Sequence, residues 1–257
     1  MAEHFAHVVR GSGPGLLLAH GGGGSIEGNY GMLIDELART HTVIGPDYPG
    51  SGDTPRSQTP LDLDVVADAV VGTAVAAGVE RFTVLGYSLG TAVAVRAATR
   101  HPDRVTGLIL TSGFSHPSNK LRLAADVWRA LLDAGDRRLL AKYLMVMGSG
   151  ERALNALSPA ELDAALDGLA AFVPDGTPEH VDLVSSVDTR AELAGISVPT
   201  LVIATLADGL VSPALSAELA AGIPGAQFAE IDAGHNIGAE AREQWLEMIQ
   251  KFLSEIG

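Results

Sequence analysis

Residues 82–100 place the pattern Gly-X-Ser-X-Gly between an apolar run and a helix-forming stretch. The run FTVL at 82–85 predicts a buried strand, GYSLG follows at 86–90, and TAVAVRAATR at 91–100 predicts a helix of small side chains. This order needs a very tight turn from strand to helix, and the two glycines leave room for it. The feature therefore requires a strand that leads directly into a helix, which favours the α/β class.

Ser88, at the centre of this turn, is a candidate nucleophile. Such a turn strains the serine backbone, exposes its hydroxyl above the sheet, and directs the amide of Leu89 toward an oxyanion formed there. The alternative is an ordinary serine that caps the helix, and the flanking strand and helix make it the weaker interpretation. Tyr87, next to Ser88, is a candidate substrate contact.

Apolar runs bounded by Gly, Pro and Asp predict strands along much of the chain, and several are apolar on both faces, as buried parallel strands are. These runs lie at 5–9, 15–20, 41–47, 82–88, 105–112, 199–206 and 226–233. Helical spacing of apolar residues occurs at 29–39, 61–78, 89–100, 212–222 and 239–255. The alternation predicts a mostly parallel, doubly wound sheet. The glycine-rich stretch 11–15 is expected to form a hairpin between the first two strands.

The alternation stops between residues 115 and 195, where the sequence is helical throughout. Ser158 is an expected N-cap there, with Pro159 at the first helical position. Ligands of open α/β sheets bind beyond the carboxyl ends of the strands, so an insertion that starts there would cover the site. We expect residues 1–114 and 196–257 to form the core and residues 115–195 to form a lid.

A serine nucleophile needs a base, and the base needs an orienting acid. Asp208 follows the strand candidate at 199–206, and His235 follows the one at 226–233. Both lie past strand ends on the edge that carries Ser88, and the order Ser, Asp, His is the one expected with this turn. Two rivals remain open. Asp232 could serve as the acid, although it would need a tight local bend, and His20 could serve as the base, although it precedes the nucleophile.

The run HGGGG at 20–24 follows a strand candidate and supplies backbone amides without intervening side chains. Such amides can complete an oxyanion hole, and we expect Gly22 to be the second donor beside Leu89, with Gly21 and Gly23 as possible replacements. A flexible linker is the weaker alternative. The glycines do not have the spacing of a phosphate loop, and the chain lacks a Gly-Lys pair, so nucleotide binding is poorly supported.

Composition limits the partners. The formal net charge is −14 at pH 7, which opposes binding to nucleic acid, and the chain has no cysteine. The first residues lack the pattern of a signal peptide, and no apolar run reaches the length of a membrane span. We therefore expect a soluble cytoplasmic protein that acts on a small molecule, with no nucleic acid or membrane as partner.

Together these segments resemble the α/β-hydrolase superfamily, in HGGGG, the loop PDYPGSGDTP at 46–55, GYSLG, ADGLVSP at 207–213 and the GH pair at 234–235. The resemblance implies an α/β-hydrolase fold, a triad of Ser88, Asp208 and His235, and no metal or organic cofactor. Within the superfamily, the chain is most similar to small esterases, lactonases, non-haem perhydrolases and carbon–carbon bond hydrolases. Epoxide hydrolases and haloalkane dehalogenases carry aspartate where this chain has Ser88. Carbon–carbon bond hydrolases usually have proline in the glycine loop, where this chain has Ser25.

The expected lid contributes large apolar residues that are candidates for the substrate pocket: Trp128, Tyr143, Met145, Met147 and Phe172. They could equally be buried against the core. Between Lys120 and Arg152 the segment carries seven cationic and four acidic residues. This excess could attract a carboxylate-bearing, carrier-linked or CoA-linked substrate, but solvated helix faces are the simpler explanation.

The leading hypothesis is a serine hydrolase that cleaves a small, largely apolar carboxylic ester, lactone or thioester through an acyl-enzyme. A carbon–carbon bond hydrolase or lyase on the same triad is one alternative. A small-molecule receptor that keeps the hydrolase fold is another, because a fold and even a triad do not fix function.

Overall fold

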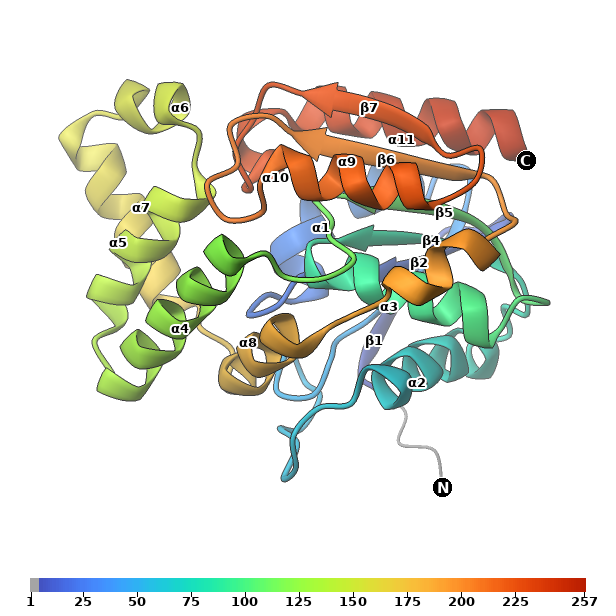
Figure 1. The fold of residues 1–257 in the computed structure, drawn as a ribbon, viewed down its shortest axis with the longest axis horizontal. Helices are drawn as coiled ribbons and strands as arrows, with labels where there is room; N and C mark the ends of the chain where they lie inside the picture. Colours follow the sequence, from blue (N-terminus) through green and yellow to red (C-terminus); the bar gives the residue numbers. More distant parts are fainter. Residues whose placement is uncertain (1–4) are drawn as a thin grey trace.

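The structure, a computed structural model, describes residues 5–257 and centres on a seven-stranded sheet of order β1-β3-β2-β4-β5-β6-β7 (Figure 1). β1 runs antiparallel to β3, and the other neighbouring strands are parallel. The strands are β1 (His7–Arg10), β2 (Gly15–Ala19), β3 (Thr42–Pro46), β4 (Phe82–Tyr87), β5 (Val105–Thr111), β6 (Thr200–Thr205) and β7 (Gln227–Ile231). The predicted doubly wound α/β sheet is therefore confirmed.

Helices cover both faces of the sheet, which explains why the central strands are apolar on both sides. On β2, Leu16 and Leu18 pack with the cluster that includes α1 (Ile26–Leu37) and α11 (Arg242–Ile256). Leu17 and Ala19 pack on the opposite face with α2 (Leu63–Ala76), α3 (Leu89–Arg100) and α9 (Pro213–Gly222). The side chains of one strand thus alternate between two buried layers.

The expected hairpin between the first two strands is wrong. β1 pairs with β3, and β2 lies on the other side of β3, so the segment after Arg10 crosses the end of β3 instead of reversing beside it. Gly11 and Gly13 have φ values of +77° and +130°, and a side chain on either would run into backbone carbonyl oxygens at residues 38–41. These glycines allow a close crossing, not a two-residue turn.

The chain between β5 and β6 forms five α-helices and one 3₁₀ helix. These are α4 (Asn119–Ala134), α5 (Arg137–Gly148), α6 (Glu151–Ala156), α7 (Pro159–Ala171), α8 (Thr177–Ser186) and η1 (Arg190–Gly195). We call α4–α8 the helical insertion. In Figure 1 the arrowheads of β4, β6 and β7 point toward the side on which α4–α7 lie. The insertion is thus placed beyond the carboxyl ends of the strands.

The start of α7 is as predicted. The Ser158 hydroxyl accepts the amide of Glu161, the Glu161 carboxylate accepts the amide of Ser158, and Pro159 occupies the first turn. The Ser158 hydroxyl also donates to the Glu161 carboxylate, and this bond, together with the one from the Ser158 amide, lowers the pKa of Glu161. The start of α1 differs from the prediction, because the helix begins at Ile26, where Ser25 caps it by accepting the amide of Gly28. Glycines at positions 28 and 31 had weakened the helical pattern there.

Near the C-terminus the predicted helix at 239–255 is divided. A short α10 (Ile237–Glu240) ends at Glu240, and α11 begins at Arg242, with Ala241 as the residue between them. No helix within residues 5–257 combines the length and the apolar character needed to cross a lipid bilayer.

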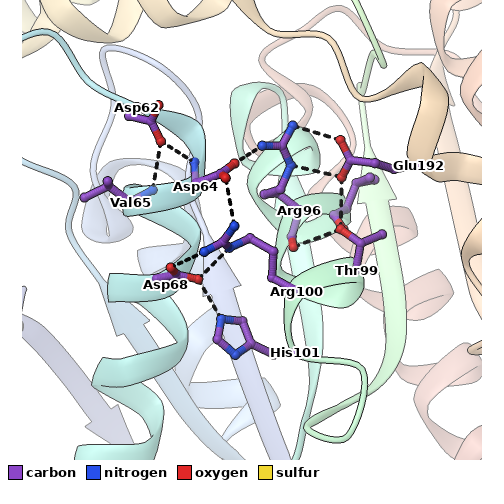
Figure 2. A network of polar contacts seen from close by, with 10 residues as sticks. Asp62, Asp64, Val65, Asp68, Arg96, Thr99, Arg100, His101 and Glu192 are labelled. Atoms are coloured by element: carbon purple, nitrogen blue, oxygen red, sulfur yellow. Dashed lines mark hydrogen bonds and ion pairs between the residues drawn. The ribbon is translucent and has the colours of Figure 1, made fainter.

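A network of ion pairs joins α2, α3 and η1 (Figure 2). Arg96 donates two hydrogen bonds to the Glu192 carboxylate, at 2.9 and 2.8 Å, and also contacts Asp64. On the next turn of α3, Arg100 donates to both oxygens of Asp68, which together with His101 lowers the pKa of Asp68. The segment that follows the insertion is thereby attached to the helix that follows Ser88.

Loss of the Arg96 guanidinium should destabilise the protein measurably. Its side chain is 20% exposed. Its ion pairs should therefore contribute more than exposed surface pairs, which are worth about 0.2–1 kcal/mol, and less than fully buried pairs. We expect Arg96→Ala to lower the free energy of unfolding by about 1–2 kcal/mol in urea titrations. Arg190→Ala, which removes an exposed pair with Asp188, should leave the unfolding midpoint unchanged. Equal midpoints for both variants would show that the network does not contribute.

Candidate active site

Ser88, His235 and Asp208 come from three separate loops and form one continuous hydrogen-bonded row. His235 Nε2 lies 3.0 Å from Ser88 Oγ, and His235 Nδ1 lies 2.6 Å from Asp208 Oδ2. The exposed fractions of the three residues are 7%, 8% and 5%, so the row is largely withdrawn from water. A carboxylate, an imidazole and a hydroxyl in this order can move a proton away from the hydroxyl.

The carboxylate of Asp208 accepts four hydrogen bonds. Oδ1 accepts the amides of Leu210 and Val211, and Oδ2 accepts the Thr205 hydroxyl and His235 Nδ1. Because every partner is a donor, Asp208 is held as an acceptor on both oxygens. This fixes the tautomer of His235 with its proton on Nδ1, leaving the Nε2 lone pair directed at Ser88.

The strained turn at Ser88 is present. Ser88 has φ +54°, in the left-handed region that a residue with a side chain rarely adopts. Its hydroxyl makes no capping hydrogen bond to α3, so the capping alternative is wrong. The Ser88 amide donates to the carbonyl of Thr111 and the Thr91 hydroxyl donates to the carbonyl of Ser88, which hold the turn from both sides.

The glycines of the turn are required by close backbone contacts. A Cβ on Gly90 would lie 1.9 Å from the carbonyl oxygen of Ala19, and one on Gly86 would lie 2.5 Å from the carbonyl oxygen of Gly90. Neither obstacle is a flexible side chain, so relief would require α3 to move away from β2 and β4.

Gly90→Ala should therefore destabilise the protein by about 3 kcal/mol or more. Gly72→Ala provides a matched control, because Gly72 lies inside α2 and nothing lies within 4 Å of an added Cβ. We expect the control to gain up to about 1 kcal/mol from helix propensity. Thermal unfolding followed by circular dichroism measures both, and a Gly90→Ala protein as stable as the control would contradict the geometry.

The glycine loop, residues 21–24, presents one amide without an acceptor. Three of its amides already donate: Gly21 to Asn29 Oδ1 at 2.9 Å, Gly23 to His180 Nδ1 at 3.1 Å and Gly24 to the carbonyl of Gly21 at 3.2 Å. The amide of Gly22 has no acceptor within residues 5–257, and neither does that of Leu89, the first residue of α3. Of the glycines considered from the sequence, Gly22 is thus the one whose amide is available to a ligand.

His20 is buried behind the glycine loop and takes no part in the row. Its Nδ1 donates to the carbonyl of Gly21, its Nε2 accepts the amide of Tyr48, and its ring stacks on that of Tyr48 at 3.8 Å. Burial, assisted by the nearby His180, lowers the pKa of His20 to about 3. The ring is therefore neutral and supports the loop.

Asp232, the rival acid, pairs with Arg152 on the surface at 2.9 Å. Its side chain is 67% exposed. The acid beside His235 is Asp208.

A cavity of about 230 Å³ opens beside Ser88 and His235. The core contributes the glycine loop, Tyr87 and Phe114 to its wall, and the insertion contributes a mostly apolar set. That set comprises Leu121, Ala125, Trp128, Leu144, Met145, Gly148, Ser149, Leu169, Phe172 and Val184. Tyr87 presents its ring, because its hydroxyl donates to the carbonyl of His235 at 2.6 Å.

Trp128, Met145 and Phe172 thus lie at the cavity, but the structure does not bring Tyr143 and Met147 there. Leu144, Met145 and Gly148 occupy the face of α5 that lines the cavity, and positions 143 and 147 fall on another face. The Tyr143 hydroxyl donates to the carbonyl of Ala124, and burial raises the pKa of Tyr143 to about 12. Both residues pack against the core cluster.

The cationic residues of the insertion do not face the cavity either. Arg138 pairs with Asp163 and Asp167, and Arg129 pairs with Asp133 and Asp182. The local excess of positive charge therefore offers no cation to a substrate inside this cavity. Within residues 5–257, no group of three or more His, Asp and Glu side chains is placed to hold a metal ion.

Two residues that support the site were missed in the sequence. The ring of His180, on α8, holds the amide of Gly23, and the Glu240 carboxylate accepts the amides of Gly150 and Gly234. Glu240 thereby joins the turn that carries His235 to the start of α6. Glu240 lies five residues after His235, and nothing in the local sequence indicates its contact with the distant Gly150. His180 is not part of any recognisable sequence motif.

Comparison with known proteins identifies the family. Residues 14–241 match the family described as alpha/beta hydrolase fold. Pyrrolizixenacetamide deacetylase of Xenorhabdus hominickii is 30% identical over 250 residues, which cover 96% of this chain and 94% of the deacetylase. The 2-hydroxymuconate semialdehyde hydrolase of Pseudomonas sp. (strain CF600) is 29% identical, covering 95% and 88% of the two chains.

Among solved structures, the enol-lactonase from Burkholderia xenovorans LB400 superposes with a TM-score of 0.84. It is 22% identical, and the match covers 97% of this chain and 96% of the lactonase. This likeness supports the fold. The chain belongs to the α/β-hydrolase family and, like its relatives, is a hydrolase.

Proposed function

We propose that the protein is a serine hydrolase that cleaves a small, uncharged carboxylic ester, lactone or thioester through an acyl-enzyme on Ser88. The observation that carries the proposal is the row from Ser88 Oγ through the His235 ring to Asp208 Oδ2, beside a mostly apolar cavity. Residues 115–195 act as the lid of this site in the proposal, because ten of these residues line the cavity.

In the first half-reaction Ser88 Oγ attacks the substrate carbonyl while its proton passes to His235 Nε2. Asp208 keeps the ring oriented and stabilises the imidazolium that forms. His235 then gives the proton to the leaving oxygen or sulfur, and the acyl group remains on Ser88. Water enters by the same route, with His235 as its base, and releases the acid. None of these steps needs a cofactor.

The developing oxyanion would be bound by the amides of Leu89 and Gly22. Both amides are without acceptors among the described residues. Gly22 lines the cavity, and Leu89 directly follows Ser88, with its Cδ2 3.5 Å from where a Gly22 Cβ would be. Amides that are already fixed and unpaired need no rearrangement as charge develops. The position of Leu89 at the N-terminus of α3 adds the favourable end of the helix dipole.

The cavity limits the size and charge of the substrate. An apolar cavity of about 150 Å³ binds benzene, so one of about 230 Å³ suits a single ring or a short chain. Within residues 5–257, the ionisable side chains on the wall are His235 and the Tyr87 phenol, and no Asp, Glu, Lys or Arg lines it. A carboxylate on the acyl group would be buried there without a cationic partner, which is unfavourable.

A substrate panel tests the proposal. We expect kcat/KM for p-nitrophenyl butyrate to exceed that for the dodecanoate and the hemisuccinate by about 10-fold or more. The dodecanoyl chain is too long for a cavity of this size, and the carboxylate of the hemisuccinate would be buried against an apolar wall. A fluorophosphonate probe should label Ser88 stoichiometrically. A preference for the hemisuccinate would contradict the assigned substrate class, and absence of labelling at Ser88 would contradict the mechanism.

The relatives extend the panel. The name of the Xenorhabdus protein indicates deacetylation of an amide, and that of the Pseudomonas protein indicates hydrolysis of a semialdehyde. The same residues support a carbon–carbon bond hydrolase as a second candidate function. An N-acetyl arylamine and a β-diketone therefore belong in the panel, and turnover of the diketone with none of the ester would favour the second candidate.

A further inference from the structure

His180 lies where three segments meet: helix α8, the loop after β3 and the glycine loop. Its side chain is fully buried. Nδ1 accepts the amide of Gly23 at 3.1 Å, and Nε2 donates to the carbonyl of Pro49 at 3.0 Å. A ring that accepts on one nitrogen and donates on the other is neutral and in one defined tautomer.

Helix α8 is firmly attached to the loop after β3. The amide of Gly176 donates to the carbonyl of Gly50 at 3.1 Å. One turn further along α8, the Glu179 carboxylate accepts two hydrogen bonds from Arg56, at 3.0 and 2.8 Å. The backbone of His180 is therefore fixed relative to this loop, and its ring reaches across to the glycine loop from a rigid base.

The glycine loop depends on such outside contacts for its shape. Glycines have wide backbone freedom and no side chains with which to anchor themselves. On one side of Gly22, His20 holds the carbonyl of Gly21 at 2.8 Å and Asn29 holds its amide at 2.9 Å. On the other side, the contact to the amide of Gly23 comes from His180.

We propose that His180 is a positioning residue for the oxyanion hole. By accepting the amide of Gly23 it fixes the peptide that follows Gly22, so that the Gly22 amide stays directed at the cavity. The inference rests on the proposed function. It also means that the helical insertion both shapes the cavity and sets the geometry of the proposed oxyanion donor.

The environment keeps His180 in the form that this role needs. Burial lowers the pKa of His180 to about 4, although the hydrogen bond to Pro49 and the charge of Glu179 act in the opposite direction. The Nδ1 lone pair is therefore available to Gly23 near neutral pH. The proposal itself depends on the two hydrogen bonds and the burial of the ring.

Two substitutions distinguish the role of Nδ1 from that of Nε2. In His180→Asn the amide oxygen takes the place of Nδ1, which keeps the acceptor for Gly23 and loses the donor to Pro49. In His180→Gln the amide nitrogen takes the place of Nε2, which keeps the donor to Pro49 and loses the acceptor. Each variant loses one hydrogen bond of the ring, so their thermal midpoints should fall by similar amounts.

The expected result is a split in kcat with p-nitrophenyl butyrate. We expect His180→Gln to lose about 10–100-fold in kcat, because a misplacement of about 1 Å can reduce a rate about 10²-fold. Its KM should change less than about 2-fold, and His180→Asn should stay within about 3-fold of the unmodified protein in both. Rates are referred to active sites titrated to completion with the fluorophosphonate, so that unfolded protein does not contribute.

Equal kcat values for the two variants would overturn the positioning role, whether both are high or both are low. So would a loss in each that only follows its thermal midpoint. Ser88→Ala runs alongside as the test of the proposed function. If Ser88→Ala abolishes turnover and His180→Gln does not reduce it, the inference about His180 fails while the serine mechanism stands.

Discussion

Ser88→Ala is expected to lower kcat for p-nitrophenyl butyrate by about 10⁵–10⁶-fold. The substitution removes the atom to which the acyl group would be attached, and the hydrogen bond from His235 to Asp208 remains. The backbone should tolerate the change, because serine already holds φ +54° at this position and alanine carries the same Cβ. Residual hydrolysis would come from the amides and the cavity alone.

Steady-state release of p-nitrophenolate measures this loss. Ser254→Ala is the matched control, since Ser254 lies exposed on α11 and its hydroxyl donates only to the carbonyl of Lys251. The control should keep full activity. If Ser88→Ala retained more than about one tenth of kcat, the nucleophile would have to be another group.

Asp208→Asn is expected to lower kcat by about 10⁴-fold. All four hydrogen-bond partners of Asp208 are donors, so the amide nitrogen of asparagine must face at least one of them. If it faces His235, the ring takes the tautomer with its proton on Nε2 and can no longer accept the proton of Ser88. If it faces the amides of Leu210 and Val211 instead, two backbone donors are left unsatisfied and the loop is destabilised.

Asp232→Asn separates this effect from a general loss of negative charge near His235. Asp232 lies three residues before His235 in the chain, but it pairs with Arg152 on the surface. We expect its kcat to match that of the unmodified protein. A loss of activity in Asp232→Asn comparable to that in Asp208→Asn would contradict the assignment of the acid.

The sequence predicted the strands and the chemistry at their ends well. Strands β2, β4 and β6 lie within one residue of the apolar runs, because burial on both faces leaves an uninterrupted apolar pattern. Ser88, Asp208 and His235 could be found for a related reason. The carboxyl ends of parallel strands meet at one edge, so residues just after three strands are brought together by topology alone.

Strand pairing was less predictable than strand position. β1 has a short, mostly exposed pattern and its partner is set by the sheet edge that remains open, which no local signal encodes. The same limit applies to the side chains that support the site. The contact from His180 to Gly23 spans 157 residues, and the ring that makes it has no neighbouring motif.

The insertion shows where helical spacing is informative and where it is not. Its helices and the cap at Ser158 follow from periodicity and local chemistry, but which face of α5 meets the cavity depends on packing against α4 and the core. Met145 and Met147 are similar residues two positions apart, and only Met145 lines the cavity. Two positions on a helix point in very different directions, so the choice between them needs the tertiary structure.

Trapping the acyl-enzyme tests the central claim most directly. Rapid mixing of the protein with p-nitrophenyl acetate, acid quenching and peptide mass spectrometry should reveal one acetyl group per chain, located on Ser88, with a burst of about one equivalent of p-nitrophenolate. The adduct should be absent from Ser88→Ala. Steady turnover without an acetyl group on Ser88, or with the group on another residue, would contradict the account.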